Sequence, residues 1–311
     1  MYRIPSFIHI YGKGVITNPD LEKLSLYLKT LLPESTIDVR TDFISFFLGQ
    51  LDSSKTDDTV DLLAGKLAGI RVLDYSKQKL NPDPLYAEID YERRKILIPA
   101  TKSIGVFYDG FELQNVYHSL MYRNFNPRFF GLRPQNDNQQ QKCHSERGEE
   151  SNSIERSEHS FAHLHIVFTN QLIATWEDDD SRYHSRSSVY GFPSIISTAG
   201  IVEAPAKPRE FYLMKQQYGM MGMDDLALAE FKNKFEGRFI EYNDPRMTEV
   251  CKGYTAQALF FHITGEPFCE DKGCRLFNAH WQAELIYSQL ESKYEFCERH
   301  TDMLNNLFAT D

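Results

Sequence analysis

The first forty residues alternate between short apolar runs and a longer helical pattern. Phe7–Tyr11 is a β-type run, and the leucines between residues 21 and 31 recur at the three- and four-residue spacing of one helix face. Asn18 is suited to cap that helix, with Pro19 at its first position. Thr36–Arg40 then returns to a strand pattern. This order predicts a β-α-β opening, which is typical of an α/β protein.

The middle of the chain repeats this alternation more loosely. Asp57–Ala68 has a helical pattern, and Lys95–Pro99 and Ile104–Tyr108 resemble strands. Four later runs are short and rich in β-branched or aromatic residues, which favours strands. These runs are Leu164–Thr169, Ser188–Phe192, Ala199–Ala204 and Arg209–Met214. The pattern predicts that a sheet continues through this part of the chain.

The last third is helical. Leu226–Phe235 has one helical pattern, and a longer helix is predicted to begin with Asp244 as its cap and Pro245 in its first turn. Its apolar residues follow the spacing of one buried stripe until Gly265, a residue suited to end a helix. The whole pattern predicts an α/β (α+β) fold, a mixed sheet with packed helices.

A polar stretch interrupts the chain at 126–161. It is rich in Asn, Gln, Ser, Glu and Arg, and such a segment buries too little apolar surface to offset its ordering entropy. We predict a disordered insertion between an N-terminal α/β portion at 1–125 and a second portion at 162–311, all within one compact domain. Cys143 and His144 lie inside the insertion, so an unstructured pair is favoured there over a metal site.

Charge and hydropathy exclude two classes of partner. The formal net charge is −10, and Lys and Arg form no basic cluster, which argues against nucleic-acid binding. No uncharged run reaches the roughly 18 residues of a membrane span, and Met1–Pro5 does not lead into a signal peptide. The sequence predicts a cytoplasmic protein. In that reducing compartment its five cysteines favour metal ligation over disulfides.

Three of the cysteines gather near the C-terminus with a histidine. Cys269 and Cys274 flank a four-residue turn, and Cys297 and His300 are separated by two residues. Two short-spaced pairs of sulfur and nitrogen ligands suit tetrahedral zinc, and four filled positions leave no place for water. The spacing predicts one structural zinc ion. The alternative is three buried free cysteines and a surface histidine.

The residues leading into this cluster resemble the signature of the archaemetzincin metalloproteases. In that family an HExxHxxGxxH motif runs directly into Cys-x4-Cys-x-Met, and a later cysteine pair completes a second zinc site. His262 matches the second histidine of the motif, Gly265 its glycine, and Cys269 and Cys274 the first cysteine pair. His300 stands in place of the last cysteine of the family. The resemblance implies a zincin-like fold for 162–311.

The same resemblance shows which residues of the HExxHxxGxxH motif this chain lacks. Ala258 replaces the first histidine, Leu259 the general-base glutamate, Phe268 the third histidine and Leu276 the methionine that follows the second cysteine. A zincin needs three metal ligands and a carboxylate beside the first of them. Of these groups only His262 remains, so zincin-type peptidase activity is not expected.

Other ligand-type residues offer replacements. His163 and His165 alternate on one face of a predicted strand, and His280 and Glu284 are four apart on a predicted helix, so each pair can chelate. Both patterns also occur at half-exposed positions without a metal. Glu266 lies close to His262 in sequence, although a carboxylate in a turn usually faces water.

Two functions remain open at this point. The first is a zinc-stabilised, catalytically silent archaemetzincin homologue that binds a peptide or protein. The second is a metal-dependent hydrolase with a rearranged site that includes His262. A nucleic-acid zinc finger fits poorly, because the chain is acidic and has no basic helix. The sequence does not indicate an oligomeric state.

Overall fold

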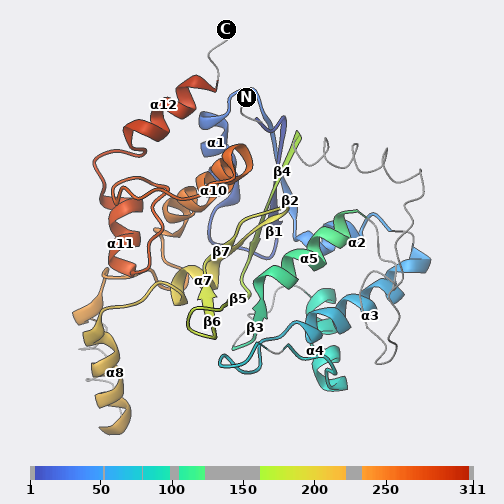
Figure 1. Ribbon diagram of the computed structural model, residues 1–311. Coiled ribbons are helices and arrows are strands. Elements are labelled where there is room, and N and C mark those ends of the chain that lie inside the picture. The colour runs from blue at the N-terminus through green and yellow to red at the C-terminus, as the bar shows by residue number, and fades with distance from the viewer. Residues whose placement is uncertain are drawn as a thin grey trace.

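Two mixed β-sheets with helices packed around them form the protein (Figure 1). The computed structural model describes residues 4–51, 53–78, 80–98, 105–122, 162–221 and 233–307. The α/β class predicted from the sequence is confirmed. The polar segment at 126–161 lies outside the described residues, as does most of the predicted helix Leu226–Phe235.

The larger sheet has five strands in the order β2-β1-β4-β8-β7. The strands are β1 (Phe7–Lys13), β2 (Thr36–Thr41), β4 (His163–Thr169), β7 (Ser188–Val189) and β8 (Ser194–Ser197). Strand β1 pairs in parallel with both β2 and β4, and β4 pairs in parallel with β8. Strand β7 is antiparallel to β8 and forms one edge of the sheet. The smaller sheet has the order β3-β5-β6, with β3 (Phe107–Asp109), β5 (Leu172–Glu177) and β6 (Arg182–Arg186).

The two faces of the larger sheet bury different sets of side chains, because residues alternate across a strand. Ile8 and Ile10 of β1 pack with α1 (Leu21–Leu31) and α10 (Met247–Thr264) in one apolar cluster. Tyr11 belongs to a second cluster with four helices. These helices, on the other side of the sheet in Figure 1, are α2 (Phe43–Leu48), α3 (Ser53–Gly69), α4 (Tyr86–Leu97) and α5 (Gly110–Met121).

Helix α10 is the central helix of the C-terminal half, since twelve of its eighteen residues are buried. It ends at Gly265, which has the left-handed conformation (φ 81°) that the sequence predicted for a terminating glycine. Around it lie α7 (Thr198–Glu203), α8 (Arg209–Met221), α11 (Gln282–Ile286) with the π-turn Tyr287–Glu291, and α12 (Glu298–Asn306).

The β-α-β opening is confirmed, but both predicted helix caps were wrong. Helix α1 is capped by Asp20, whose carboxylate accepts the N–H of Lys23 at 3.1 Å. Asn18 instead donates to the backbone carbonyl of Asp244 at 2.7 Å, so it joins the segment before α1 to the segment before α10. The carboxylate of Asp244 is used in the turn before α10, where it accepts the N–H of Arg246 at 2.8 Å.

Three predicted strands are helices instead. Lys95 lies in α4, where it shares a buried helical face with Glu92, and the Tyr108 hydroxyl donates to that carboxylate at 2.7 Å. The run Ala199–Ala204 became α7 because the Ser197 hydroxyl accepts the N–H of Gly200 at 2.8 Å and starts a helix. Arg209–Met214 begins α8. Apolar runs this short fit a buried helix turn as well as a strand.

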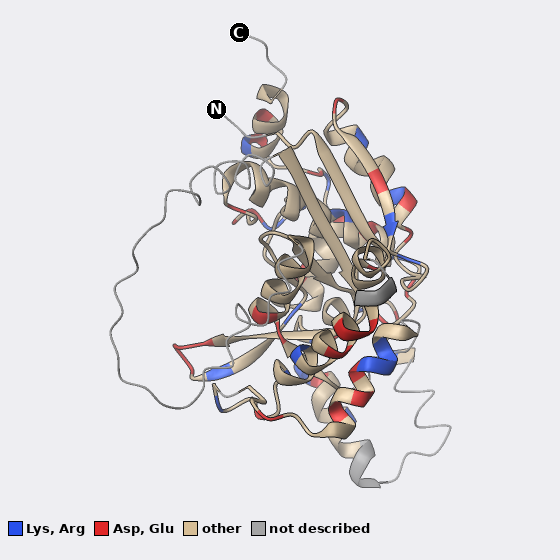
Figure 2. Ribbon diagram, turned by 90° about the vertical axis from the view of Figure 1, so that its right-hand side faces the viewer, with Lys and Arg blue, Asp and Glu red and all other residues tan. Residues whose placement is uncertain are grey.

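Charge is distributed evenly over the described elements. Figure 2 shows Lys and Arg interspersed with Asp and Glu along the helices, while the strands at the centre are mainly uncharged. Within the part of the chain that the structure describes, no helix combines the length and apolar character needed to span a bilayer.

Candidate functional site

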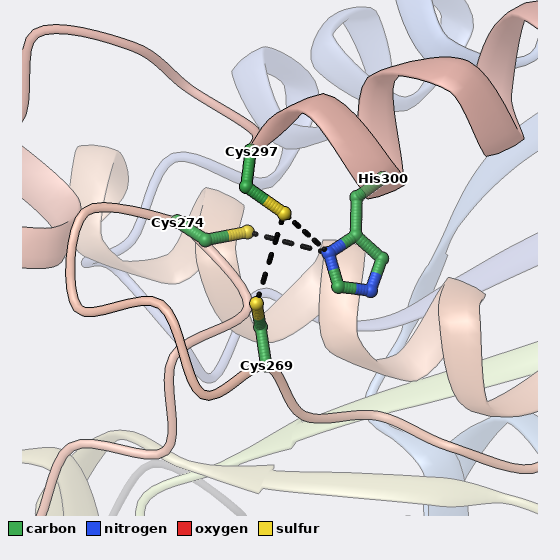
Figure 3. A group of neighbouring side chains, drawn as sticks. All are labelled: Cys269, Cys274, Cys297 and His300. Carbon is green, nitrogen blue, oxygen red and sulfur yellow. Dashed lines mark hydrogen bonds between the residues drawn. The ribbon is translucent and has the colours of Figure 1, made fainter.

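The four predicted zinc ligands converge on one point at the C-terminal end of the molecule (Figure 3). Their ligand atoms all lie within 4.8 Å of one another. Sγ of Cys269 is 3.8 Å from Sγ of Cys297, and Nδ1 of His300 is 3.6 Å from Sγ of Cys274 and 3.1 Å from Sγ of Cys297. This group of four residues, Cys269, Cys274, Cys297 and His300, is called the cysteine cluster below.

These distances fit a metal centre better than a disulfide. A disulfide requires its sulfur atoms about 2.05 Å apart. With metal–ligand bonds of about 2.3 Å to sulfur and about 2.0 Å to nitrogen, a tetrahedral zinc ion sets neighbouring sulfurs about 3.8 Å apart and a sulfur and a nitrogen about 3.5 Å apart. The Cys269–Cys297 and Cys274–His300 distances of 3.8 and 3.6 Å match these values. The cysteine cluster is therefore a group that can hold a metal ion.

The first pair of ligands is fixed by a tight turn. The N–H of Cys274 donates to the carbonyl of Asp271 at 3.0 Å, and the N–H of Asp271 donates to Sγ of Cys269 at 3.4 Å. Gly273 packs closely against Tyr294, since a Cβ there would lie 2.5 Å from the Tyr294 hydroxyl oxygen and would require that side chain to move. That hydroxyl donates to the Asp271 carboxylate at 2.8 Å, which ties the turn to the segment before the second pair.

Helix α12 supplies the second pair. Cys297 is its N-cap and His300 lies in its first turn, so the three-residue spacing puts both side chains on one face. His300 is buried, with its ring edge-on to Phe260 of α10 at a centroid distance of 5.2 Å. The helix thus holds the imidazole against the protein core, with Nδ1 toward the thiols.

Burial changes the pKa values of Cys269, Cys274 and His300. Burial and the neighbouring thiols raise the pKa of Cys274 to about 12, and burial also raises the pKa of Cys269. Burial lowers the pKa of His300, which favours the neutral imidazole that ligates metals. A bound cation reverses the effect on the thiols, because a coordinating thiol is deprotonated outright.

The positions that the sequence resemblance aligns with the zincin motif lie on or next to α10. Ala258 and Leu259 are fully buried in the core cluster, and His262 is half-buried near the end of the helix. Phe268 is 42% exposed, so it does not fill a core position. Among the described residues, His262 belongs to no group of three possible metal ligands.

A cavity of about 600 Å³ opens beside α10, and neither Ala258 nor His262 lines it. The helix contributes Tyr254, Gln257 and Phe261 to its wall, and Phe268 follows after the helix. Strand β7, at the edge of the larger sheet, forms part of the opposite wall. The Tyr190 hydroxyl donates to the side-chain carbonyl of Gln257, and Gln257 donates to the carbonyl of Phe277 at 3.2 Å. These two bonds hold the side-chain amide of Gln257 in place in the cavity wall.

The remaining predicted candidates have other roles. His280 precedes α11, and the Glu284 carboxylate accepts the backbone N–H groups of His280 and Trp281 at 3.1 and 3.3 Å. Glu284 therefore caps the helix, and His280 lies before its first residue, so the two residues do not share a helix face as the sequence spacing predicted. Glu266 is exposed and forms an ion pair with Arg299 at 3.4 Å.

Sequence reasoning missed two other groups of possible metal ligands. His9 of β1 joins His163 and His165, and Glu177, Asp180 and His184 gather on the β5–β6 hairpin. Strand alternation placed His163 and His165 on one face, but no motif links them to His9, 154 residues away. The hairpin group is partly exposed, and its carboxylates are already engaged with arginines.

Two family models match different parts of the chain. A family of unknown function (DUF7001) matches residues 9–126. No curated protein and no solved structure matches the chain. The model of the probable metallopeptidase family (DUF6775) matches residues 148–307, just over half of the 311 residues, and includes the cysteine cluster and α10. The chain therefore belongs to this probable metallopeptidase family.

Proposed function

We propose that the protein is an archaemetzincin-like member of its family that binds a peptide or protein segment beside α10 and has no zincin-type peptidase activity. One observation supports this most directly. The cavity along the helix is lined by Gln257, Phe261 and Phe268, while the motif positions Ala258 and Leu259 are buried in the core. The cavity thus offers a surface for binding and no metal ligand from α10.

In this proposal the cysteine cluster holds one structural zinc ion. The three thiols and the imidazole fill all four positions of a tetrahedral ion, so no position remains for a reactive water molecule. Zinc is favoured over harder ions because thiolates are soft ligands. The ion would fasten the turn at Cys269–Cys274 to α12 and stabilise the segment that follows α10.

The walls of the cavity suit an extended peptide. Its aromatic wall includes Tyr190, Phe261 and Phe268, with Tyr190 edge-on to Phe268 at a centroid distance of 5.8 Å. On the other side, β7 is an edge strand, so its outer backbone groups are available to a further strand. Peptides that add to a sheet edge gain affinity from backbone hydrogen bonds and specificity from pockets for their side chains.

Binding is tested with a mixture of random fluorescent peptides and the full-length protein. Selected peptides should bind the unmodified protein and lose about 10-fold or more in affinity in Phe268→Ala, because a buried aromatic contact contributes on the order of 1–2 kcal/mol. Tyr86→Ala is the matched control, since Tyr86 is a solvent-exposed aromatic of α4 outside the cavity. Equal losses in both variants would contradict the assignment of the cavity.

A metal-dependent hydrolase with a rearranged site that includes His262 is the second candidate, favoured by the family match. Peptide hydrolysis by the unmodified protein, with added zinc and with or without a chelator, separates the two. We expect no cleavage. Cleavage that is sensitive to the chelator and disappears in His262→Ala would contradict the proposal of a binding protein and support the hydrolase.

A further inference from the structure

Three histidines gather on one face of the larger sheet, far from the cysteine cluster in the sequence. His9 lies on β1, and His163 and His165 lie on the neighbouring β4. His9 is the direct register partner of His165, and His163 is two residues before His165 on the same face. The parallel pairing of the two strands thus brings the three rings into contact. His9, His163 and His165 are called the histidine cluster below.

The ligand atoms of the histidine cluster are close enough to share one ion. One nitrogen from each residue lies within 4.8 Å of the other two, and Nε2 of His9 is 2.9 Å from Nδ1 of His163. Neighbouring nitrogen ligands of a tetrahedral zinc ion are about 3.3 Å apart, given bonds of about 2.0 Å. The His9–His163 distance is slightly shorter than this value and the other two distances do not exceed 4.8 Å, so modest side-chain rotations are sufficient. His9 and His165 are buried and His163 is half-buried.

The residues around the histidine cluster orient its rings. Asp38 of β2 is the register partner of His9, and its carboxylate lies 2.5 Å from Nδ1 of that ring. A histidine that donates its Nδ1 hydrogen to a carboxylate presents Nε2 as a ligand, the arrangement found around many protein-bound metals. Tyr11 has the same relation to His165, with its hydroxyl oxygen 2.9 Å from Nδ1. Asp38 and Tyr11 therefore act as outer partners, that is, hydrogen-bond partners of the Nδ1 atoms of His9 and His165 that leave each Nε2 for a ligand.

Arg40 fixes both of these partners. Its guanidinium donates to the Asp38 carboxylate at 2.8 Å and to the Tyr11 hydroxyl at 2.9 Å, and it lies over the ring of Phe46 at 4.6 Å. The positive charge of Arg40 is paired with Asp38 and so opposes a cation in the cluster only weakly. Burial raises the pKa of Tyr11 to about 12, which keeps its hydroxyl neutral.

The histidine cluster also has space beside it. All three rings line a cavity of about 370 Å³, together with Arg40, Phe46, Phe47, Gln50, Met121 and Tyr122. This cavity gives an ion a route to the rings and leaves room for a fourth ligand. Three histidines with an open fourth position are a known ligand set for zinc that binds water or substrate, whereas four filled positions are typical of structural zinc.

We propose that the histidine cluster binds one divalent transition-metal ion, Zn²⁺ in the first instance, through Nε2 of His9, Nδ1 of His163 and Nε2 of His165. The ion replaces the hydrogen bond between His9 and His163. Its fourth position faces the cavity and takes water or a small ligand. This site shares no residue with the cavity beside α10 and does not depend on the proposed peptide binding.

The test is a calorimetric titration of Zn²⁺ into untagged, full-length protein that has been treated with a mild chelator and still holds zinc at the cysteines. The unmodified protein should bind one further equivalent. His163→Gln should weaken this binding by more than 100-fold, beyond the roughly 10- to 100-fold that loss of an outer partner causes. His184→Gln removes a histidine of the hairpin group and is the matched control, expected to bind like the unmodified protein.

Two results would overturn the proposal. The first is the absence of a further equivalent in the unmodified protein, a measurement that needs no variant to fold. The second is a further equivalent that His163→Gln still binds and His184→Gln does not bind. This result would assign the ion to the group on the β5–β6 hairpin. Zinc retained at the cysteines in each variant verifies that the variant is folded. Peptide affinity should be the same in the unmodified protein and in His163→Gln, since His163 does not line the cavity beside α10.

Discussion

The cysteine cluster and the histidine cluster are both groups of possible metal ligands, but they are built differently. The cysteine cluster draws all its ligands from residues 269–300, in two pairs that each lie on one turn. The histidine cluster joins His9 to two residues about 154 positions later, through the pairing of β1 with β4. Spacing in a sequence therefore reveals the first kind of site, while the second kind becomes visible only when the strand register is known.

Their chemistry differs as well. The cysteine cluster has soft ligands and leaves no open position, which suits an ion that stabilises the fold. The histidine cluster has neutral nitrogen ligands and an adjacent cavity, which suits an ion that exchanges and binds a further ligand. The predictions below separate the two sites, beginning with the largest expected effect.

Removing one thiol should affect stability most. Cys274 is fully buried in the cysteine cluster, and Cys274→Ser should remove its zinc, because metal-binding energy at such a site is also folding energy. We expect a loss of at least about 3 kcal/mol in the free energy of unfolding and a drop on the order of 10 °C in Tm. Metal analysis and thermal denaturation of the purified variant measure both effects.

Cys251→Ser is the matched control for this variant. Cys251 is equally buried, but it lies on α10 and takes no part in the cysteine cluster. Its replacement buries a hydroxyl group and should cost about 1–3 kcal/mol while all the zinc is retained. A full equivalent of zinc in Cys274→Ser, or its loss in Cys251→Ser, would show that the ligands are assigned wrongly.

A chelator should distinguish the two clusters in the unmodified protein. We expect a mild chelator to remove metal from the histidine cluster, which has an open position and an adjacent cavity, while zinc stays at the cysteine cluster, whose four ligands leave no open position. Because β1 and β4 are already joined by parallel backbone pairing, Tm should fall by only a few degrees when the ion of the histidine cluster leaves. Metal content and Tm are measured together at rising chelator concentration. Loss of both ions at the same chelator concentration would contradict the proposed difference between the two clusters.

Asp38→Asn is a finer test of the histidine cluster. The change keeps the size of the side chain but removes the carboxylate that orients His9, so zinc affinity should fall by about 10- to 100-fold. Asp179→Asn, a change at an exposed acidic residue of the β5–β6 hairpin, is the control and should leave the affinity unchanged. Titration of both variants with Zn²⁺ gives the comparison. Equal affinities would mean that Asp38 has no part in metal binding.

The predictable part of the molecule is the part set by local pattern. Gly265, the strands β1, β2 and β4 and the grouping of the four residues of the cysteine cluster were predicted because each depends on residues close in sequence. The cap predicted at Asp244 was wrong because its carboxylate accepts the N–H of Arg246 before α10 begins, and the cap predicted at Asn18 was wrong because its side chain binds Asp244, 226 residues away in the sequence. His9 was missed for the same reason, since its neighbours are set by strand pairing.

The smallest effect is expected from the polar insertion, which lies outside the described residues. Deleting Asn136–Ser157 should change Tm by no more than about 2 °C, because this composition offers little apolar surface to bury. Zinc content should stay the same, since none of these residues belongs to either cluster. Thermal denaturation of the shortened chain measures the effect. A drop of more than several degrees would show that the segment packs against the fold.

The most direct test of the account is X-ray absorption at the zinc edge, on full-length protein from which the exchangeable metal has been removed by a mild chelator. The account predicts one equivalent of zinc with three sulfur ligands at about 2.3 Å and one nitrogen ligand at about 2.0 Å, from Cys269, Cys274, Cys297 and His300. A shell of nitrogen and oxygen ligands alone, or protein without zinc, would contradict it.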